Sequence, residues 1–346
     1  MKHKLYFLIA TLVAISMVLV ACAPQPAAPV AEEPVAEAPA EVEQPVAPEE
    51  YIYVSAMGNL EFFNAHKFGW RWAGEQLGVT TSYVGPAEYD MVAMVAAFDL
   101  AIAKNPAGIC VFGVEPVLIP SINKATEAGI PVVTILGDLP ESRRIAFVGS
   151  SQFDLGYTGG TRLAEALGGR GQVAILSIPG VKMFDDREDG FRAAFEAFPD
   201  IEVVAVGDTK ADTVTAISVA KDIMLRFPDL AAFVGTDSTG GIGAATAVEE
   251  AGRVGEVKTV AMDRNSDVLE MIRNGTLTGT VAQDDAAMAF WCLQTLYKYN
   301  HHHAPLTSEN VAAGVSTGPV NVFMSVNYID STNLEYFLAA NKLYTE

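Results

Sequence analysis

The sequence predicts an α/β protein made of two doubly wound parallel-sheet lobes with a ligand cleft between them. Short, uninterrupted apolar runs alternate with helical segments from Tyr51 onward, a pattern typical of strands buried on both faces of a parallel sheet. The alternation begins anew after Ser150 and continues for a similar length. Two such series predict two lobes, and ligands of such sheets bind beyond the carboxyl ends of the strands.

The first series reads as four strands and three helices. Gly78 and the pair Asn105-Pro106 end two of the helices, and Gly129 precedes the fourth strand. The expected strands are 52–56, 79–84, 108–112 and 132–136, and the expected helices are 62–77, 91–103 and 117–128.

The second series is longer and is punctuated in the same way. Pro199 and Pro228 each follow a helical segment, and proline does not continue a helix. The expected strands are 172–177, 201–206, 231–234, 257–262 and 277–282. The expected helices are 155–167, 187–198, 212–227, 242–251 and 267–273, followed by a long last helix, 286–299.

We expect the chain to cross between the lobes three times. Crossings are expected near Ser150, near Gln283 and near residues 315–318, and the long last helix is expected to return to the first lobe. The first lobe would then hold residues 51–150 and 284–315. The second lobe would hold residues 151–283 and 316–346.

The N-terminus carries an export signal. Lys2 and Lys4 form a basic start, and an apolar run of residues 5–20 follows that is too short to read as a spanning helix. The run ends in Leu-Val-Ala before Cys22, which resembles the bacterial lipobox. That resemblance implies cleavage after residue 21 and lipidation of Cys22, so that acyl chains hold the protein at a membrane. The alternative is an ordinary secretory signal with a chance cysteine.

Residues 22–50 form an expected disordered tether. After Cys22 the segment consists of Pro, Ala, Val, Glu and Gln, without an aromatic or basic residue. Such a composition buries too little apolar surface to offset the entropy of ordering, and its prolines and like charges keep it extended. We expect it to lift the folded part off the membrane surface.

The charge balance narrows the class of partner. The net charge is −20, and residues 51–346 keep 35 acidic and 20 basic residues, a net of −15. Nucleic acids are recognised through basic patches, so they are excluded as partners. The sequence contains no spacing of metal ligands and no cofactor motif that withstands inspection, and no cofactor is expected.

Two cysteines remain after Cys22. Cys110 lies in a buried strand and Cys292 in a helical run. An oxidising compartment permits a disulfide between them. Free cysteine is commonly a small core residue, however, so two buried free thiols are the favoured interpretation.

The residues at the strand ends carry a resemblance to a known family. The segment 55–63, SAMGNLEFF, places a serine, an asparagine and two phenylalanines after the first strand, and 129–134 reads GIPVVT. Asp237, Asp263 and Gln283 then follow three later strands in order. This set resembles the ribose/galactose-type periplasmic sugar-binding proteins, type 1 solute-binding lipoproteins of ABC importers. The resemblance implies a two-lobed receptor, not an enzyme, that closes on a small solute and delivers it to a membrane permease.

A neutral sugar is recognised by dense hydrogen bonds and an apolar wall, so carboxylates, amides and aromatic rings suit such a site. Asp263 and Gln283 are the strongest candidates. Asp263 and Asp237 are also suited to cap the helices that follow them, and the phenylalanines to pack internally. The candidate ligand-binding residues are Asn59, Phe62, Phe63, Asp138, Arg187, Thr236, Asp237, Asp263 and Gln283.

Two of these candidates stand where the chain departs from the family pattern. Many relatives carry an aspartate directly after the fourth strand, whereas this chain has Leu136-Gly137 and then Asp138. Arg187 is the candidate for the cleft arginine, and a surface position at a helix start is the alternative. These departures leave the choice between a hexose and a pentose open.

Two other classes of function fit parts of the sequence. A sensory receptor that presents a bound autoinducer-like compound, nucleoside or amino acid to a membrane signalling protein would need the same fold. An enzyme is disfavoured because no set of nucleophile and base is found. Gly241-Ile242-Gly243 reads as glycines of an ordinary helix start, and the histidines 301–303 as a solvated loop.

Overall fold

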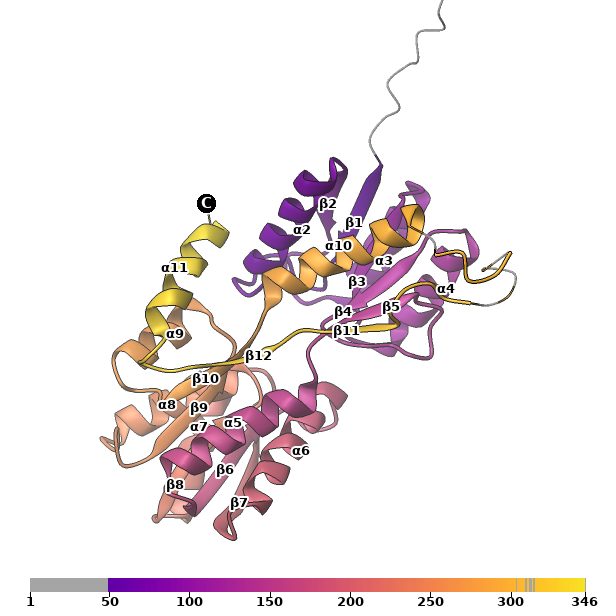
Figure 1. The fold of residues 1–346 in the computed structure, drawn as a ribbon. Helices are drawn as coiled ribbons and strands as arrows, with labels where there is room; N and C mark the ends of the chain where they lie inside the picture. The colour runs from indigo at the N-terminus through magenta and orange to yellow at the C-terminus, as the bar shows by residue number, and fades with distance from the viewer. Residues whose placement is uncertain (1–48, 303, 309, 311–312, 314, 346) are drawn as a thin grey trace, which may run out of the picture. The chain divides into compact units, whose positions relative to one another are not determined.

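The structure is a computed structural model that describes residues 49–302, 304–308, 310, 313 and 315–345 (Figure 1). The predicted signal peptide, Cys22 and nearly all of the predicted tether lie outside the described residues. Glu49 and Glu50, which the sequence assigns to the tether, belong instead to the folded part. Glu50 starts the first strand and pairs with Thr80, and Glu49 Oε2 accepts a hydrogen bond from the Tyr51 hydroxyl at 2.9 Å.

The first sheet, within the described residues, has six parallel strands in the order β11-β5-β4-β3-β1-β2. Its strands are β1 (Glu50–Val54), β2 (Thr80–Val84), β3 (Gly108–Phe112), β4 (Val132–Ile135), β5 (Ala146–Gly149) and β11 (Asn321–Phe323). Its helices are α2 (Phe63–Leu77), α3 (Met91–Ala103), α4 (Ile119–Glu127) and α10 (Asp285–His301), with a 3₁₀ turn η1 (Pro116–Leu118). Because β1 is flanked by β2 and β3, the strand order reverses there, which is where doubly wound sheets bind ligands.

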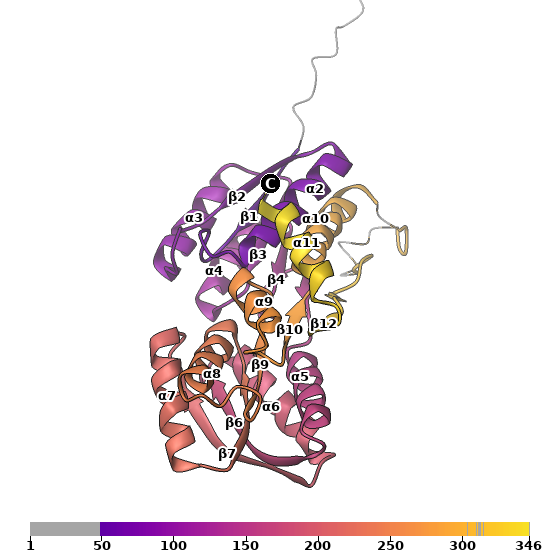
Figure 2. The same ribbon diagram turned by 90° about the vertical axis from the view of Figure 1, so that its left-hand side faces the viewer.

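The second sheet, in the same part of the chain, has the order β12-β10-β9-β8-β6-β7, with β12 antiparallel to β10. Its strands are β6 (Arg170–Ser177), β7 (Asp200–Asp208), β8 (Leu230–Gly235), β9 (Lys258–Met262), β10 (Gly279–Gln283) and β12 (Val326–Ile329). Its helices are α5 (Gln152–Ala166), α6 (Lys182–Glu196), α7 (Thr213–Arg226), α8 (Ser238–Glu250), α9 (Ser266–Arg273) and α11 (Leu334–Thr345). Figure 2 shows the two sheets, each with helices packed beside it.

The predicted two-lobed α/β architecture is confirmed. The chain crosses between sheets after β5, where α5 begins at Gln152, and again after Gln283, where α10 returns to the first lobe as predicted. The prediction of the third crossing was wrong. It lies between Phe323 and Val326, not near residues 315–318, because β11 extends the first sheet by pairing with β5.

Several boundaries also differ from the sequence expectation. Strands β5, β11 and β12 and helix α11 were not predicted. Helix α8 starts at Ser238, not at 242, because the Asp237 carboxylate caps it by accepting from the Gly240 N–H at 3.0 Å. The glycines read as helix-start residues lie inside α8, where a Cβ on Gly241 would clash with Ala261 of β9 and a Cβ on Gly243 would clash with Ala216 of α7. They therefore allow α8 to pack closely on a strand and on a helix.

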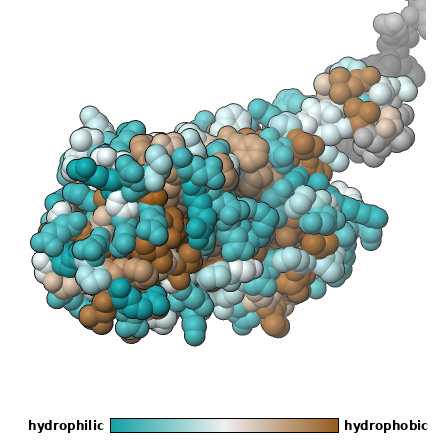
Figure 3. All heavy atoms as spheres, turned by 90° about the horizontal axis from the view of Figure 1, so that it is seen from below, coloured by the Kyte–Doolittle hydropathy of each residue, from teal (hydrophilic) through white to brown (hydrophobic). Residues whose placement is uncertain are grey.

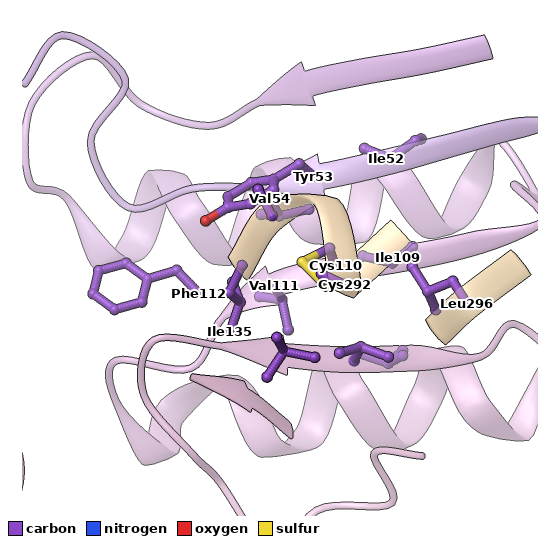
Figure 4. Packing of buried hydrophobic residues seen from close by; sticks show 14 of the residues in the cluster. Ile52, Tyr53, Val54, Ile109, Cys110, Val111, Phe112, Ile135, Cys292 and Leu296 are labelled. Carbon is purple, nitrogen blue, oxygen red and sulfur yellow. A yellow bond between two sulfur atoms is a disulfide. The ribbon is translucent and has the colours of Figure 1, made fainter. Parts of the chain in front are cut away.

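A disulfide joins Cys110 of β3 to Cys292 of α10, and the favoured reading of two free thiols was wrong (Figure 4). The two Cα atoms are 6.4 Å apart, and both side chains are fully buried in the core of the first lobe. Met288, Leu293 and Leu296 of α10 lie in the same core. The return of α10 brings the cysteines together, and a linear reading of the sequence does not contain that packing.

The prediction that the histidines at 301–303 lie in a loop was wrong for His301. His301 is the last residue of α10, and its Nε2 lies 2.9 Å from Glu49 Oε2. Asn300 Nδ2 donates to the Tyr51 hydroxyl at 3.1 Å. The end of α10 is therefore tied to the residues at the start of β1.

No helix among the described residues has both the length and the apolar character needed to cross a bilayer. In the same part of the chain, no three His, Cys, Asp or Glu side chains gather as a metal site would require. Polar and apolar side chains are interspersed on the face shown in Figure 3.

Candidate solute-binding site

Three strands of the second lobe end in polar residues that the sequence singled out. Thr236 and Asp237 follow β8, Asp263 follows β9, and Gln283 ends β10. Because β8, β9 and β10 are neighbouring parallel strands, their carboxyl ends lie at one edge of the sheet. The fold therefore brings these four residues to the edge where doubly wound sheets bind ligands.

Arg187 joins this group from α6 and is not the surface residue of the alternative reading. Its side chain is 3% exposed. The Nε atom donates to Gln152 Oε1 at 2.8 Å, and Nη1 donates to the Thr236 carbonyl oxygen at 2.7 Å. Burial lowers the pKa of Arg187, and the carboxylates of Asp263, Asp237 and Asp285 oppose that shift. Its Nη2 makes no hydrogen bond with the described residues.

Asp263 is held in an unusual backbone conformation. Its φ is +69°, in the left-handed region that aspartate tolerates better than most residues. The Asp263 N–H donates to the Val281 carbonyl oxygen at 2.8 Å, and its carbonyl oxygen accepts from Thr280 Oγ1 at 2.7 Å. The carboxylate is thus directed by a backbone fixed to β10, and such strain clusters at functional sites.

The Asp263 carboxyl group also has a shifted pKa. Its pKa is raised to about 6, with burial as the largest cause. The charge of Arg187 opposes the rise, and the charges of Asp285 and Asp237 add to it. The side chain is still partly accessible. A poorly solvated, accessible carboxylate next to a buried arginine is suited to accept hydrogen bonds from the hydroxyl groups of a solute.

Gln283 is the clearest unsatisfied group at this edge. Its side chain is 3% exposed, and its Oε1 has no hydrogen-bond partner. Leaving a buried acceptor unpaired costs about 1–3 kcal/mol, so a solute hydroxyl that donates to Oε1 would recover that cost. Gln283 thus combines the right position with an unmet demand for a donor.

Thr236 and Asp237 have partners within the protein. Thr236 is fully buried, and its Oγ1 donates to Ser177 Oγ at 3.2 Å. Asp237 caps α8, as the alternative reading of the sequence proposed. The charge of Asp237 still acts on Arg187 and Asp263, so it shapes the electrostatics of the site.

The first lobe separates the two phenylalanines. Phe63 is 2% exposed and packs against Phe112, with ring centroids 5.8 Å apart. Phe62 is only partly buried, so it is the ring available to a solute. Asn59 is exposed, and its N–H donates to the Ala87 carbonyl oxygen at 3.0 Å, which leaves its side-chain amide available.

Asp138 does not present a free carboxylate. Its Oδ1 and Oδ2 accept from Nε and Nη2 of Arg144 at 2.5 and 2.7 Å, and Thr134 donates to Oδ1 at 3.1 Å. Arg144 Nη1 also donates to the Val320 carbonyl oxygen at 3.1 Å. The pair therefore ties the residues after β4 to the segment that leads into β11, and we leave Asp138 out of the solute site.

Sequence reasoning missed a buried histidine–aspartate pair next to the crossing between the lobes that follows Gln283. His66 of α2 is fully buried, and its Nε2 lies 3.6 Å from Asp285 Oδ1 at the start of α10. The Tyr53 hydroxyl lies 3.3 Å from His66 Nδ1. Asp285 lies only two residues after Gln283, and this closeness to a predicted strand-end residue could have identified it. The charge of Asp285 reaches both Arg187 and Asp263, so it belongs to the electrostatics of the site.

A small pocket lies beside this edge. Its lining comes from the segment before α2, the start of α2, the segment before α9, the start of α10 and the end of α11. It includes Glu61, Phe62, Arg264 and Asp285. Arg187, Asp263 and Gln283 do not line it. The pocket therefore borders the strand-end cluster and is not the proposed solute position itself.

Comparison with known proteins supports the architecture. The family described as periplasmic binding protein domain matches residues 51–301. The chain is 28% identical over 251 residues to the D-allose-binding periplasmic protein of Escherichia coli, covering 69% of this chain and 81% of that protein. It is 28% identical over 250 residues to the D-ribose/D-allose-binding protein of Pseudomonas aeruginosa, covering 70% and 74%.

Solved structures of sugar-binding proteins also superpose on this chain. A sugar-binding protein of a sugar ABC transporter from Bacillus halodurans superposes with a TM-score of 0.79 at 31% identity, covering 84% of this chain and all of that one. The arabinose-binding protein AraP of Geobacillus stearothermophilus gives 0.78 at 29% identity, covering 84% and 99%. These proteins are solute-binding proteins, and this chain likewise is not an enzyme. The chain belongs to the periplasmic binding protein family and has its two-lobed type 1 fold, as the strand-end residues predicted.

Proposed function

We propose that this protein is a monomeric extracytoplasmic lipoprotein that binds a neutral monosaccharide between its lobes. It delivers that sugar to the membrane permease of an ABC importer. The unsatisfied Oε1 of buried Gln283, beside the carboxylate of Asp263 and the unused Nη2 of Arg187, carries the proposal. Together they offer two acceptors and one donor within one polar edge. A polyhydroxy solute both donates and accepts, so it satisfies all three.

The first lobe would complete the site from the opposite side. The partly buried ring of Phe62 suits the C–H face of a sugar, and the amide of Asn59 suits its hydroxyls. Three carboxylates act on the single charge of Arg187, so the cluster does not attract an anionic solute. The relatives named above as allose-, ribose- and arabinose-binding proteins make a pentose or hexose the first class to test.

A thermal-shift screen tests this assignment directly. The full mature chain is heated with pentoses, hexoses, polyols, nucleosides and amino acids in turn. We expect a neutral monosaccharide to raise the Tm, because a ligand at one hundred times its Kd stabilises the folded state by about 2.7 kcal/mol. Stabilisation by amino acids or nucleosides alone would overturn the sugar assignment and leave a solute receptor.

The lipid anchor is a separate part of the proposal, resting on the lipobox-like end of the signal at Cys22. Replacing Cys22 with Ser removes the thiol that takes the diacylglycerol, so we expect the variant to lose lipid labelling and move to the soluble fraction. The parent protein keeps Cys22 and serves as the control, which should stay with the membrane. Unchanged membrane partitioning of the Cys22 variant would contradict the anchor.

A further inference from the structure

A carboxylate of the first lobe contacts the start of a helix in the second lobe. Glu61 lies in the segment between β1 and α2, next to Phe62. Its Oε1 accepts from the Ser266 N–H at 3.1 Å and from Ser266 Oγ at 2.5 Å. Ser266 is the first residue of α9. The contact therefore joins the two segments that carry Phe62 in one lobe and Asp263 in the other.

The contact supplies what α9 lacks. The first N–H groups of a helix have no partner within the helix and usually receive one from the N-cap side chain. Asn265 at the N-cap of α9 makes no such bond. Glu61 takes that role from the other lobe and places a negative charge at the positive end of the helix. Helix α9 is therefore completed by a residue that belongs to its neighbour lobe.

The segment between Asp263 and α9 is held firmly on its other side. Asn341 of α11 donates from Nδ2 to the Arg264 carbonyl oxygen at 2.7 Å. The Arg264 guanidinium lies 5.0 Å from the ring of Tyr344 and 5.4 Å from the ring of Phe337. With its backbone tied to α11, this short segment transmits the position of Ser266 to Asp263.

We propose that the contact between Glu61 and Ser266 is an interlobe latch that holds the lobes together around the bound solute. This inference rests on the proposed function, since the latch matters for a protein that closes on a ligand. Glu61 is a positioning residue and does not touch the solute. A latch changes the population of the closed state, so it scales the affinity for every solute by the same factor. The effect falls mainly on release, because the contact must break before the lobes separate.

Variants of Glu61 test the latch with the sugar found in the screen and with a weaker-binding sugar. We expect Glu61→Ala to weaken both affinities by the same factor, about three- to tenfold, and to raise the release rate accordingly in stopped-flow measurements. Glu61→Gln keeps an acceptor oxygen without the charge, so its affinity and release rate should lie between those of the parent and of Glu61→Ala. Glu75→Ala is the matched control, because Glu75 is exposed on α2. Among the described residues its carboxylate pairs with Arg71, where Nε and Oε1 are 3.9 Å apart.

A double-mutant cycle with Ser266→Ala identifies the partner. The loss in the double variant should be smaller than the sum of the two single losses, because both remove one contact. Affinities unchanged in Glu61→Ala would overturn the latch, and a changed ratio between the two sugars would show instead that Glu61 contacts the solute.

Small-angle scattering of the solute-free proteins gives a readout that does not depend on the proposed ligand. We expect a larger radius of gyration for Glu61→Ala than for the parent and for Glu75→Ala. Equal radii would overturn the latch even if no sugar binds, whereas a parent that binds no sugar overturns the proposed function alone.

Discussion

Replacing Asp263 with Asn should weaken sugar binding at least tenfold and, at neutral pH, make the solute-free protein more stable. Binding suffers because the amide removes the charge and one acceptor, and a hydrogen bond to a charged group contributes about 1.5–3 kcal/mol, where each 1.4 kcal/mol is a factor of ten. Asparagine also tolerates the left-handed backbone at this position, where φ is +69°. The substitution therefore tests the carboxylate without straining the segment.

The gain in stability follows from the raised pKa. Burial raises the pKa of Asp263 from 3.8 to about 6, so the folded state holds this proton more tightly than the unfolded state. The stability that the proton provides is fully present below about pH 4 and is lost as the pH rises through 6. The ionised carboxylate then costs up to about 3 kcal/mol at neutral pH, and the neutral amide avoids that cost.

Calorimetry at two pH values checks both parts. We expect Asp263→Asn to raise the Tm of the solute-free protein by several degrees at pH 7.5 and by little at pH 4.5. Titration with the sugar from the screen gives the affinities. Asp222→Asn, at an exposed position on α7, is the matched control and should change neither quantity. Equal affinities would remove Asp263 from the site, and a stability gain that is independent of pH would contradict the raised pKa.

Removing the disulfide should have the largest effect on stability. Cys110 and Cys292 are 182 residues apart in sequence, so their bond closes a very long loop in the unfolded chain. In the chain-entropy account such a loop contributes up to about 5 kcal/mol. We expect Cys110→Ala with Cys292→Ala to lower the free energy of unfolding by about 3–5 kcal/mol and the Tm by roughly 10 °C.

The single variants distinguish a disulfide from two separate core thiols. Either substitution alone breaks the bond, so each should lose nearly as much stability as the double variant. Denaturant unfolding of the three variants and the parent measures these losses, with Cys22→Ser as a background that leaves the core unchanged. Losses that simply add would mean that the two cysteines act as independent small core residues.

Strand ends were the most predictable part of the site. Buried parallel strands are short apolar runs, so the polar residue that ends each run can be read directly, as at Asp263 and Gln283. Arg187 could be proposed as a site residue, but its position could not be predicted. The sequence does not show whether a helix-start residue faces the sheet edge or the solvent. The structure buries it against Gln152 and Thr236.

Contacts that depend on the folded arrangement were not predictable, whether their partners lie near or far along the chain. Asp138 looked like a substitute for a missing aspartate, but Arg144 binds its carboxylate. The three-residue strand β11 has too few residues to show a period, and its pairing with β5 places it in the first lobe. Glu61 meets Ser266 across 205 positions of sequence. In each case the partner is supplied by the folded arrangement.

The sequence by itself determined the two-lobed α/β class and the strand-end positions of Asp263 and Gln283. These follow from local properties, namely apolar runs, helix ends and the alternation between them, which act over a few residues. Only the tertiary structure decided the pairing of Cys110 with Cys292, the partner of Asp138 and the crossing after Phe323. Those outcomes depend on which surfaces pack together, and packing joins residues whose separation along the chain carries no periodic signal.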